Sequence, residues 1–380
     1  MQQENMETLE SLEDFRHFSE KELEIRFAQL KKQIVPADET IREQAEKHWG
    51  RVAKPLGSLG VLEEDIVRAA AAQGGKVPDF SKRALLIFCA DNGVVEEGVS
   101  QTGQEVTAAV VSNMTRGRSC SCLMAEKAET DVFPIDIGIA CEVEHQGKLH
   151  PLTERKIRRG TSNFTKEAAM TRQEVLTAVL TGIDAVRVLK DREYRLFTVG
   201  EMGIGNTTTS SAVASVLLRK EPELVTGCGA GLDLAGLKRK TKAIRRGIDL
   251  HQPDPMDGMD VLQKVGGFDL AAMAGAFLGG AIYHVPVVID GVIAAAAAAA
   301  AGRIARAATD YMLAAHVSAE PASIWLLDLI GVTPAIRAGL RLGEGTGALA
   351  LFPLLDMALS IYRDMDTFAE MEIEEYKPLV

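Results

Sequence analysis

The sequence lacks three features that mark common classes of protein. Cysteine occurs only five times in 380 residues, an odd number that does not fit a disulfide framework. Lysine and arginine total 42 against 53 aspartates and glutamates, and the net charge of −11 argues against a nucleic-acid surface. No stretch reaches the ~18 uninterrupted apolar residues of a membrane span, and the acidic start lacks a signal peptide. We expect a cytoplasmic protein with reduced thiols that binds neither nucleic acid nor membrane.

Most of the negative charge lies at the two ends of the chain. Residues 1–30 carry a net charge of −5 and residues 363–380 one of −4, which leaves −2 for residues 31–362. Apolar residues from Leu9 to Leu30 recur at helical spacing and predict a helix there. Hydrophobic residues make up 47% of the chain and charged ones 25%, as in globular proteins with a sizeable core. The nearly neutral middle can accommodate a small anionic ligand.

From about residue 80, short apolar runs each end in small or acidic residues, and helix-like sequence follows each run. The clearest runs are residues 84–89, 131–135, 196–199 and 285–289. Helix-like sequence includes residues 210–218 and the eight alanines at 294–301. The alternation predicts an α/β fold, a mostly parallel sheet with helices on both faces. Ligands of such sheets bind outside the carboxyl ends of the strands, so we expect the functional residues directly after each run.

The segment at residues 199–209, VGEMGIGNTTT, places glycines and hydroxyl groups between an expected strand and an expected helix. Free backbone N–H groups and the helix dipole make such a helix start a site for anions, phosphate above all. The glycine spacing matches neither the dinucleotide-binding motif nor the Walker loop. A glycine-rich turn with a threonine cap is therefore the alternative interpretation.

Two carboxylates stand at loop positions where chemistry is expected. Glu201 lies in the glycine-rich turn, and Glu344 lies between two glycines ahead of the apolar segment 348–359. An acid near a helix start can serve the helix alone. Flanking glycines favour instead a group that a ligand approaches closely. Two carboxylates at separate loop ends suit proton removal and the stabilisation of positive charge.

A basic segment at residues 237–246 reads as a helix whose charges mostly face solvent. At ~100° per residue, Lys240 falls about 60° from the centre of the apolar face, so its stem can lie inward and offer the ammonium group to an anion. The seven histidines show no HExxH spacing. Residues 120–122, Cys-Ser-Cys, read as ordinary thiols on a helix rather than a metal or redox site. We expect no metal.

Taken together, these segments resemble the nicotinate-nucleotide:dimethylbenzimidazole phosphoribosyltransferase family. The resemblance rests on residues 54–60 (KPLGSLG), 90–107 (with ADNGVV, GVS and QEVT), 200–208 (GEMGIGNTT), 266–275 (GGFDLAAMAG) and 342–347 (LGEGTG), in the family's order. It implies a large, doubly wound α/β nucleotide-binding domain over residues 81–318. It also implies a smaller, mainly helical domain from residues 1–80 and 319–380 that completes the active site, and a homodimer.

The resemblance implies the transfer of phosphoribose from nicotinate mononucleotide to 5,6-dimethylbenzimidazole or a related base, with inversion at the anomeric carbon. The products would be α-ribazole 5′-phosphate and nicotinate, a step of cobalamin biosynthesis without a cofactor. Glu344 matches the general base, Glu201 would stabilise positive charge or orient the base, and Lys240 would bind the anionic groups. Phosphate and ribose would contact Gly203, Gly205, Asn206, Thr207, Asp290 and Gly291. The flat base would lie against Met202, Leu342, Ser100 and Gln104.

Two positions depart from the family pattern. Asn92 stands where many relatives carry histidine, and residues 315–321, AHVSAEP, stand where others have a longer His/Ser-rich motif. Both lie near expected strand ends, so adenine, benzimidazole variants and phenols stay open as acceptors. A non-catalytic, nucleotide-binding regulatory subunit is the main alternative, because binding alone needs neither Glu344 nor Glu201. A Rossmann-type dehydrogenase is disfavoured by the glycine spacing.

Overall fold

The computed structural model describes residues 8–229 and 231–376. Its centre is a seven-stranded sheet in the order β3-β2-β1-β4-β5-β6-β7, in which every neighbouring pair is parallel. The strands are β1 (Arg83–Ala90), β2 (Thr130–Gly138), β3 (Thr153–Glu154), β4 (Leu196–Met202), β5 (Val287–Ile289), β6 (Met312–His316) and β7 (Pro334–Ile336). The chain builds outward from β1 to one edge and then from β4 to the other, so the order reverses between β1 and β4. This confirms the predicted doubly wound α/β fold.

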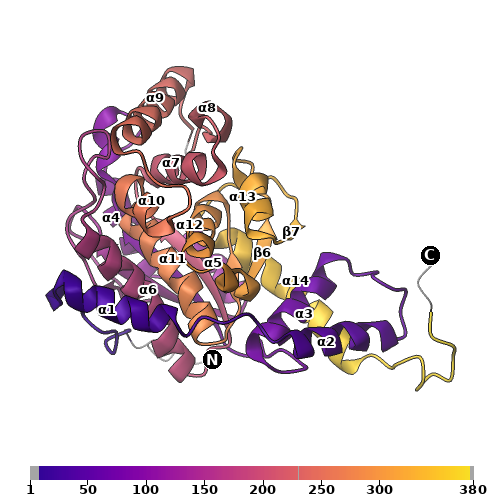
Figure 1. The fold of residues 1–380 in the computed structure, drawn as a ribbon. Helices are drawn as coiled ribbons and strands as arrows, with labels where there is room; N and C mark the ends of the chain where they lie inside the picture. Colours follow the sequence, from indigo (N-terminus) through magenta and orange to yellow (C-terminus); the bar gives the residue numbers. More distant parts are fainter. Residues whose placement is uncertain (1–7, 230, 377–380) are drawn as a thin grey trace.

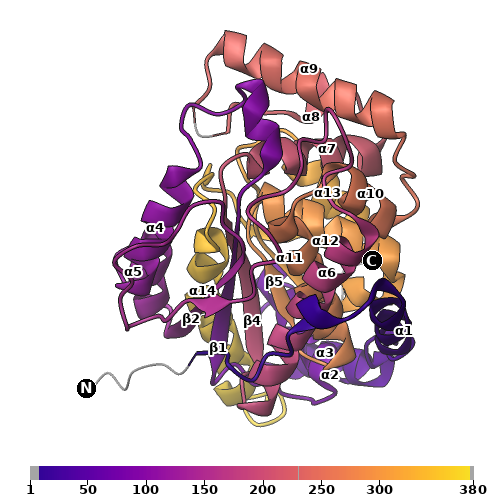
Figure 2. The ribbon, with the colours of Figure 1, turned by 90° about the vertical axis from the view of Figure 1, so that its left-hand side faces the viewer.

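Helices cover both faces of the sheet (Figure 2). One face carries α6 (Arg172–Asp191), α7 (Asn206–Leu218), α10 (Gly258–Val265), α11 (Phe268–Ile282), α12 (Val292–Ile304) and α13 (Ser323–Ile330). The other carries α3 (Val61–Gln73), α4 (Glu105–Thr115), α5 (Cys120–Lys127) and α14 (Thr346–Asp364). Successive residues of β1 alternate between the two cores: Leu86 and Phe88 join the first, Leu85 and Ile87 the second. A strand buried on both faces explains the uninterrupted apolar run.

The alanine run at residues 294–301 is buried throughout α12, which packs against α11. Small side chains allow this close packing, as the sequence predicts. The outer helices α8 (Pro222–Val225) and α9 (Leu234–His251) pack on α7, and α9 lies across the end of the molecule where β4 meets α7 (Figure 2).

The N-terminal segment is helical over a shorter range than its apolar spacing predicts. A 3-10 turn (Phe15–His17) precedes α1 (Glu20–Lys31), which packs on α6. The helix begins only at Glu20 because Ser19 and Glu22 form a capping box there. The expectation of a helix from Leu9 onward is therefore wrong over its first half, residues 9–19.

Residues 39–73 and 346–368, from the two ends of the sequence, meet beside the sheet. Helix α2 (Glu39–Arg51) packs on α3, and this pair extends away from the sheet together with the end of α14 (Figure 1). Trp49 packs edge-on against Tyr362, and Val52 pairs with Thr367. Strand β7, which lies within residues 319–380, is nevertheless an edge strand of the sheet. The division into residues 81–318 and the two ends stays a prediction. In the described part of the chain, every helix is too short or too polar to cross a membrane.

Candidate active site

A cleft of about 190 Å³ opens at the carboxyl ends of β4, β5 and β6. Glu201 and Met202 at the end of β4 form one wall, and Asp290 and Gly291 directly after β5 form the next. His316, the last residue of β6, and residues 341–344 complete it. The cleft thus lies where parallel sheets bind their ligands.

The turn between β4 and α7 is pressed against the end of β1. A Cβ atom on Gly203 would lie 1.6 Å from the carbonyl oxygen of Ala90, so only glycine fits there. Gly205 has φ of 98°, a left-handed conformation, and stands directly before α7. No side chain caps the first turn of α7, and its residues Asn206 and Thr207 line the cleft. The helix start therefore lacks a side-chain cap and faces the cleft, and its use as an anion site stays a prediction.

Lys240 reaches this helix start from α9. Its side chain is fully buried, as the helical spacing predicts. The ammonium Nζ donates to Thr207 Oγ1 at 2.9 Å and to the carbonyl of Gly227 at 3.2 Å. Burial lowers the pKa of Lys240 to about 8, and the nearby Glu320 carboxylate offsets part of that effect. Because this pKa lies near neutral pH, the charge of Lys240 depends on the charge of any ligand that binds beside it.

Glu201 is buried at the end of β4, and its carboxylate accepts a hydrogen bond from the side-chain amide of Asn206. Burial, followed by the charges of Asp269, Asp290 and Glu344, raises the pKa of Glu201 well above its usual value. Glu201 therefore keeps its proton to a higher pH than an ordinary glutamate does.

Glu344 lies in a loop with unusual backbone geometry. Gly343, Glu344 and Gly345 have φ of 89°, 58° and 80°, three consecutive left-handed residues. The conformation costs a non-glycine residue roughly 1–3 kcal/mol, so surrounding contacts must hold it. A Cβ atom on Gly200 would lie 2.6 Å from the carbonyl carbon of Glu344, which shows how closely the loop approaches β4. The carboxylate itself accepts a hydrogen bond from Ser121 Oγ at 2.9 Å.

Asp290 ties the cleft to the start of α14. Its Oδ1 accepts hydrogen bonds from the backbone N–H groups of Gly347, at 2.6 Å, and Ala348, at 3.1 Å. The imidazole Nε2 of His316 lies 3.9 Å from the same oxygen, and both side chains are buried. Burial raises the pKa of Asp290, and the charge of His316 opposes this effect.

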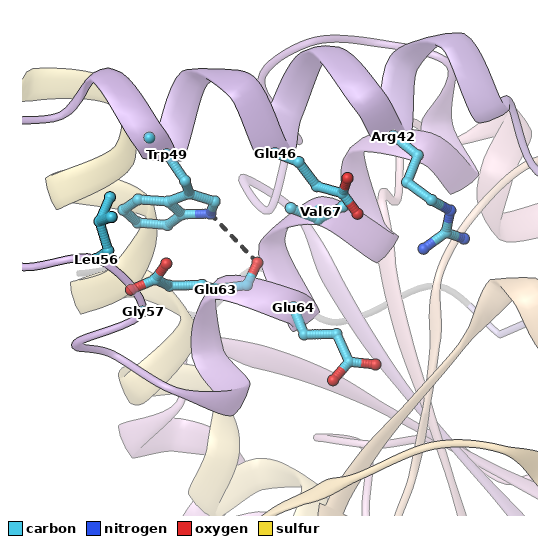
Figure 3. A pocket seen from close by; sticks show the side chains of 9 residues that line it. Arg42, Glu46, Trp49, Leu56, Gly57, Glu63, Glu64 and Val67 are labelled. Carbon is cyan, nitrogen blue, oxygen red and sulfur yellow. Dashed lines mark hydrogen bonds between the residues drawn. The ribbon is translucent and has the colours of Figure 1, made fainter. Parts of the chain in front are cut away.

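A second hollow, of about 320 Å³, lies between α2 and α3 (Figure 3). The carboxylates of Glu46, Glu63 and Glu64 line it, and the indole of Trp49 donates to the carbonyl of Glu63 at 3.2 Å. Its lining cation, Arg42, is already paired with Glu39. Three carboxylates disfavour an anionic ligand, so the cleft at the ends of the strands is the candidate active site.

The comparisons with known proteins agree with this geometry. The family described as "Phosphoribosyltransferase" matches residues 34–373. The chain belongs to this phosphoribosyltransferase family. It is 43% identical to the nicotinate-nucleotide–dimethylbenzimidazole phosphoribosyltransferase of Clostridium acetobutylicum over 92% of this chain and 98% of that one. The Escherichia coli protein of the same name is 39% identical over 91% and 96%. A Thermus thermophilus structure of the same name gives a TM-score of 0.82 at 36% identity, covering 89% of this chain and 100% of that chain.

Most residues that the sequence assigns to this phosphoribosyltransferase site converge in the structure. The cleft is lined by Glu201, Met202, Gly203, Asn206, Thr207, Asp290, Gly291, Leu342 and Glu344, with Gly205 and Lys240 directly behind. Ser100 and Gln104 are not among the residues that line it. Ser100 Oγ accepts from the N–H of Thr102, and the side-chain amide of Gln104 donates to the carbonyl of Asn92 at 3.4 Å. Their contact with a flat base stays a prediction.

The departure at Asn92 lies behind the cleft rather than in it. Its side chain is fully buried, and a Cβ atom on Gly267 would lie 2.3 Å from Asn92 Oδ1 and 2.4 Å from Asp269 Oδ1. Asn92 and Asp269 therefore face the same small space. Burial raises the pKa of Asp269 to about 7.

Sequence reasoning missed several residues of the site. His316, Ser318, Glu320 and Arg341 line the cleft without a role having been assigned to them. The first three fall in the segment 315–321, which spans the end of β6, and the end of a parallel strand is a position where ligand contacts are expected. Ser121, by contrast, stands between two cysteines on another helix and gives no local sign that it contacts Glu344.

Proposed function

We propose that this phosphoribosyltransferase moves phosphoribose from nicotinate mononucleotide to 5,6-dimethylbenzimidazole or a related base, with release of nicotinate. The observation that carries the proposal is a single cleft with the N-terminus of α7, Thr207 and Lys240 on one side and the Glu344 carboxylate on another. We call the first group the anion cradle. The first side can bind a phosphate, and the Glu344 carboxylate can accept a proton. The relatives carry enzyme names, so a non-catalytic regulatory subunit has no support.

The anionic end of the substrate would lie at the start of α7. There the backbone N–H and the hydroxyl of Thr207, together with the Lys240 ammonium, can donate to a phosphate. The other N–H groups of this turn already donate to backbone carbonyls. Asp290, held by two N–H groups of α14, is placed to accept from a ribose hydroxyl. These contacts fix the sugar ring relative to the cleft wall, which converts an encounter of two substrates into an oriented reaction.

The chemical step is a direct displacement at the anomeric carbon. One azole nitrogen forms a bond to C1′ while the bond from C1′ to the nicotinate nitrogen breaks. The electron pair of the broken bond neutralises the pyridinium, so the leaving group needs no acid. The N–H proton of the other azole nitrogen passes to Glu344, the general base. Attack from the face opposite nicotinate inverts the centre and gives the α-linked product.

Glu201 is proposed to orient the acceptor base. Because burial raises the pKa of Glu201, its carboxyl group can keep its proton in the cleft and donate a hydrogen bond to the acceptor base. Met202 lines the wall, and Leu342, with 52% of its surface exposed, stands at the mouth. We propose a homodimer in the cytoplasm on the family resemblance alone.

Incubation of the protein with nicotinate mononucleotide and a panel of benzimidazoles, purines and phenols tests the proposal. Nicotinate release is followed by chromatography and the product by mass. We expect release that depends on the acceptor, with dimethylbenzimidazole among the substrates. Binding of the mononucleotide without release for any acceptor would overturn the enzymatic function.

A further inference from the structure

A contact between distant parts of the chain holds the carboxylate of Glu344. Ser121, 223 residues earlier, is the second residue of α5 and is fully buried. Its hydroxyl donates to Glu344 Oε2 at 2.9 Å, and its backbone N–H lies 3.4 Å from the same oxygen. The carboxylate of the loop therefore sits on the first turn of α5, where negative charge is also favoured by the helix dipole.

Ser121 is itself held by a neighbouring hydroxyl. Ser119 caps α5: its Oγ accepts from the backbone N–H of Cys122 at 3.2 Å and lies 2.7 Å from Ser121 Oγ. Each serine has one hydroxyl proton to give. The Ser119 proton has two acceptors within reach, Ser121 Oγ at 2.7 Å and the Cys122 sulfur at 3.1 Å. Because the proton of Ser121 points to Glu344 and sulfur is the weaker acceptor, we assign the Ser119 proton to Ser121. The Cys122 thiol in turn donates to the carbonyl of Met114 at 3.4 Å.

The resulting chain of donors runs in one direction, from the Cys122 N–H through Ser119 and Ser121 to Glu344 Oε2. Hydrogen bonds arranged in series polarise one another, so the last bond is strengthened by those behind it. The chain ends on an acceptor, which suits an ionised carboxylate. In the described part of the protein, no hydrogen bond engages the second oxygen, Oε1, while Glu344 lines the cleft. One oxygen is thus anchored and the other is available.

We propose that Ser121 is a positioning residue for the general base. By anchoring Oε2 it keeps the left-handed loop at Glu344 in place and aims Oε1 at the azole N–H, so that Oε1 takes the proton. Ser121 does not touch substrate and acts only through Glu344. This inference rests on the proposed function, in which Glu344 is the base.

Ser121→Ala tests the proposal. The alanine fits the space and removes only the hydroxyl. Nicotinate mononucleotide should bind as before, so its KM should stay within about twofold. The kcat should fall on the order of 10-fold to 100-fold, because the general base is misplaced. Ser121→Thr keeps the hydroxyl and should recover most of kcat. Cys120→Ala, an exposed neighbour on the same helix, is the matched control and should leave both constants unchanged. Equal Tm values for Ser121→Ala and the control exclude loss of folding.

A double-mutant cycle separates this inference from the proposed function. In a Glu344→Ala background, Ser121→Ala should cause no further loss, because it has no base left to position. If Glu344→Ala loses turnover but Ser121→Ala keeps full kcat, or if the two losses multiply, the inference about Ser121 is wrong and the proposed function stands. If Glu344→Ala keeps full turnover, the assignment of the base itself is overturned and the inference falls with it.

Discussion

Lys240 Nζ lies 2.9 Å from Thr207 Oγ1, a contact that joins the buried face of α9 to the first turn of α7. It places the buried ammonium group beside the N-terminus of α7, which we assign to phosphate. Because the ammonium group already has two protein acceptors, it is fixed in position before a ligand arrives.

The affinity for nicotinate mononucleotide should fall as the pH rises through the pKa of Lys240, about 8. Only the protonated amine attracts phosphate, so above that pH each unit removes most of the remaining charged form. Calorimetric titrations from pH 7 to 9.5 measure this fall in affinity. Glu320 and Cys228 also influence the pKa of Lys240, so the same titrations on Lys240→Met are needed to show that the pH dependence comes from Lys240. That variant should bind about 10-fold to 100-fold more weakly at pH 7, the value of a charged hydrogen bond, and show a flatter profile. A Lys240→Met profile as steep as that of the wild type would contradict the assignment.

Glu344→Ala should retain most nicotinate mononucleotide binding and lose most transfer. Removal of a general base typically costs 10²-fold to 10⁴-fold in rate, and the carboxylate lies apart from the phosphate cradle. Calorimetry gives the affinity, and nicotinate release gives kcat. Unchanged kcat in this variant would remove Glu344 from the mechanism.

Much of this site follows from local sequence, but its supporting contacts do not. Glu201 and Asp290 could be placed because each follows an apolar run that a parallel sheet buries, and Lys240 because helical spacing turns it inward. Ser121 could not be placed, since its partner is 223 residues away and depends on how α5 packs against the loop before α14. The extent of the N-terminal helix was missed because apolar spacing does not register a capping box at Ser19.

Gly347→Ala should disrupt the cleft, since the new Cβ would lie 2.0 Å from His316 Cδ2 and 2.9 Å from Asp290 Oδ1. The buried imidazole has little room to give way, so we expect a cost of about 1–3 kcal/mol and weaker mononucleotide binding. Gly50→Ala is the control. It lies within α2 with no atom near the added methyl group, and should stabilise the protein by roughly 0.5–1 kcal/mol. In thermal melts, we expect the Tm of Gly347→Ala to fall below that of wild type and the Tm of Gly50→Ala to rise above it. A Gly347→Ala protein as stable and as active as wild type would refute the crowding at His316.

Asp65→Asn should stabilise the protein at neutral pH. Asp65 is buried in α3 with no hydrogen bond to Oδ2 among the described residues, and burial raises its pKa well above the usual 3.8. With rising pH the unfolded chain releases this proton first, so the carboxyl group increasingly favours unfolding above pH 4. The variant should therefore melt at least about 2 °C higher than wild type at pH 7, with a smaller difference at pH 4. A larger gain at pH 4 than at pH 7 would show that the sign is wrong.

We propose that the displacement at the anomeric carbon is direct and takes place in the cleft between α7 and Glu344. The most direct measurement is the configuration of the product formed from β-linked nicotinate mononucleotide and dimethylbenzimidazole, read by NMR alongside nicotinate release. For a direct displacement we expect one nicotinate released for each α-linked nucleotide formed, and no release without acceptor. A β-linked product, or nicotinate released in the absence of acceptor, would contradict it.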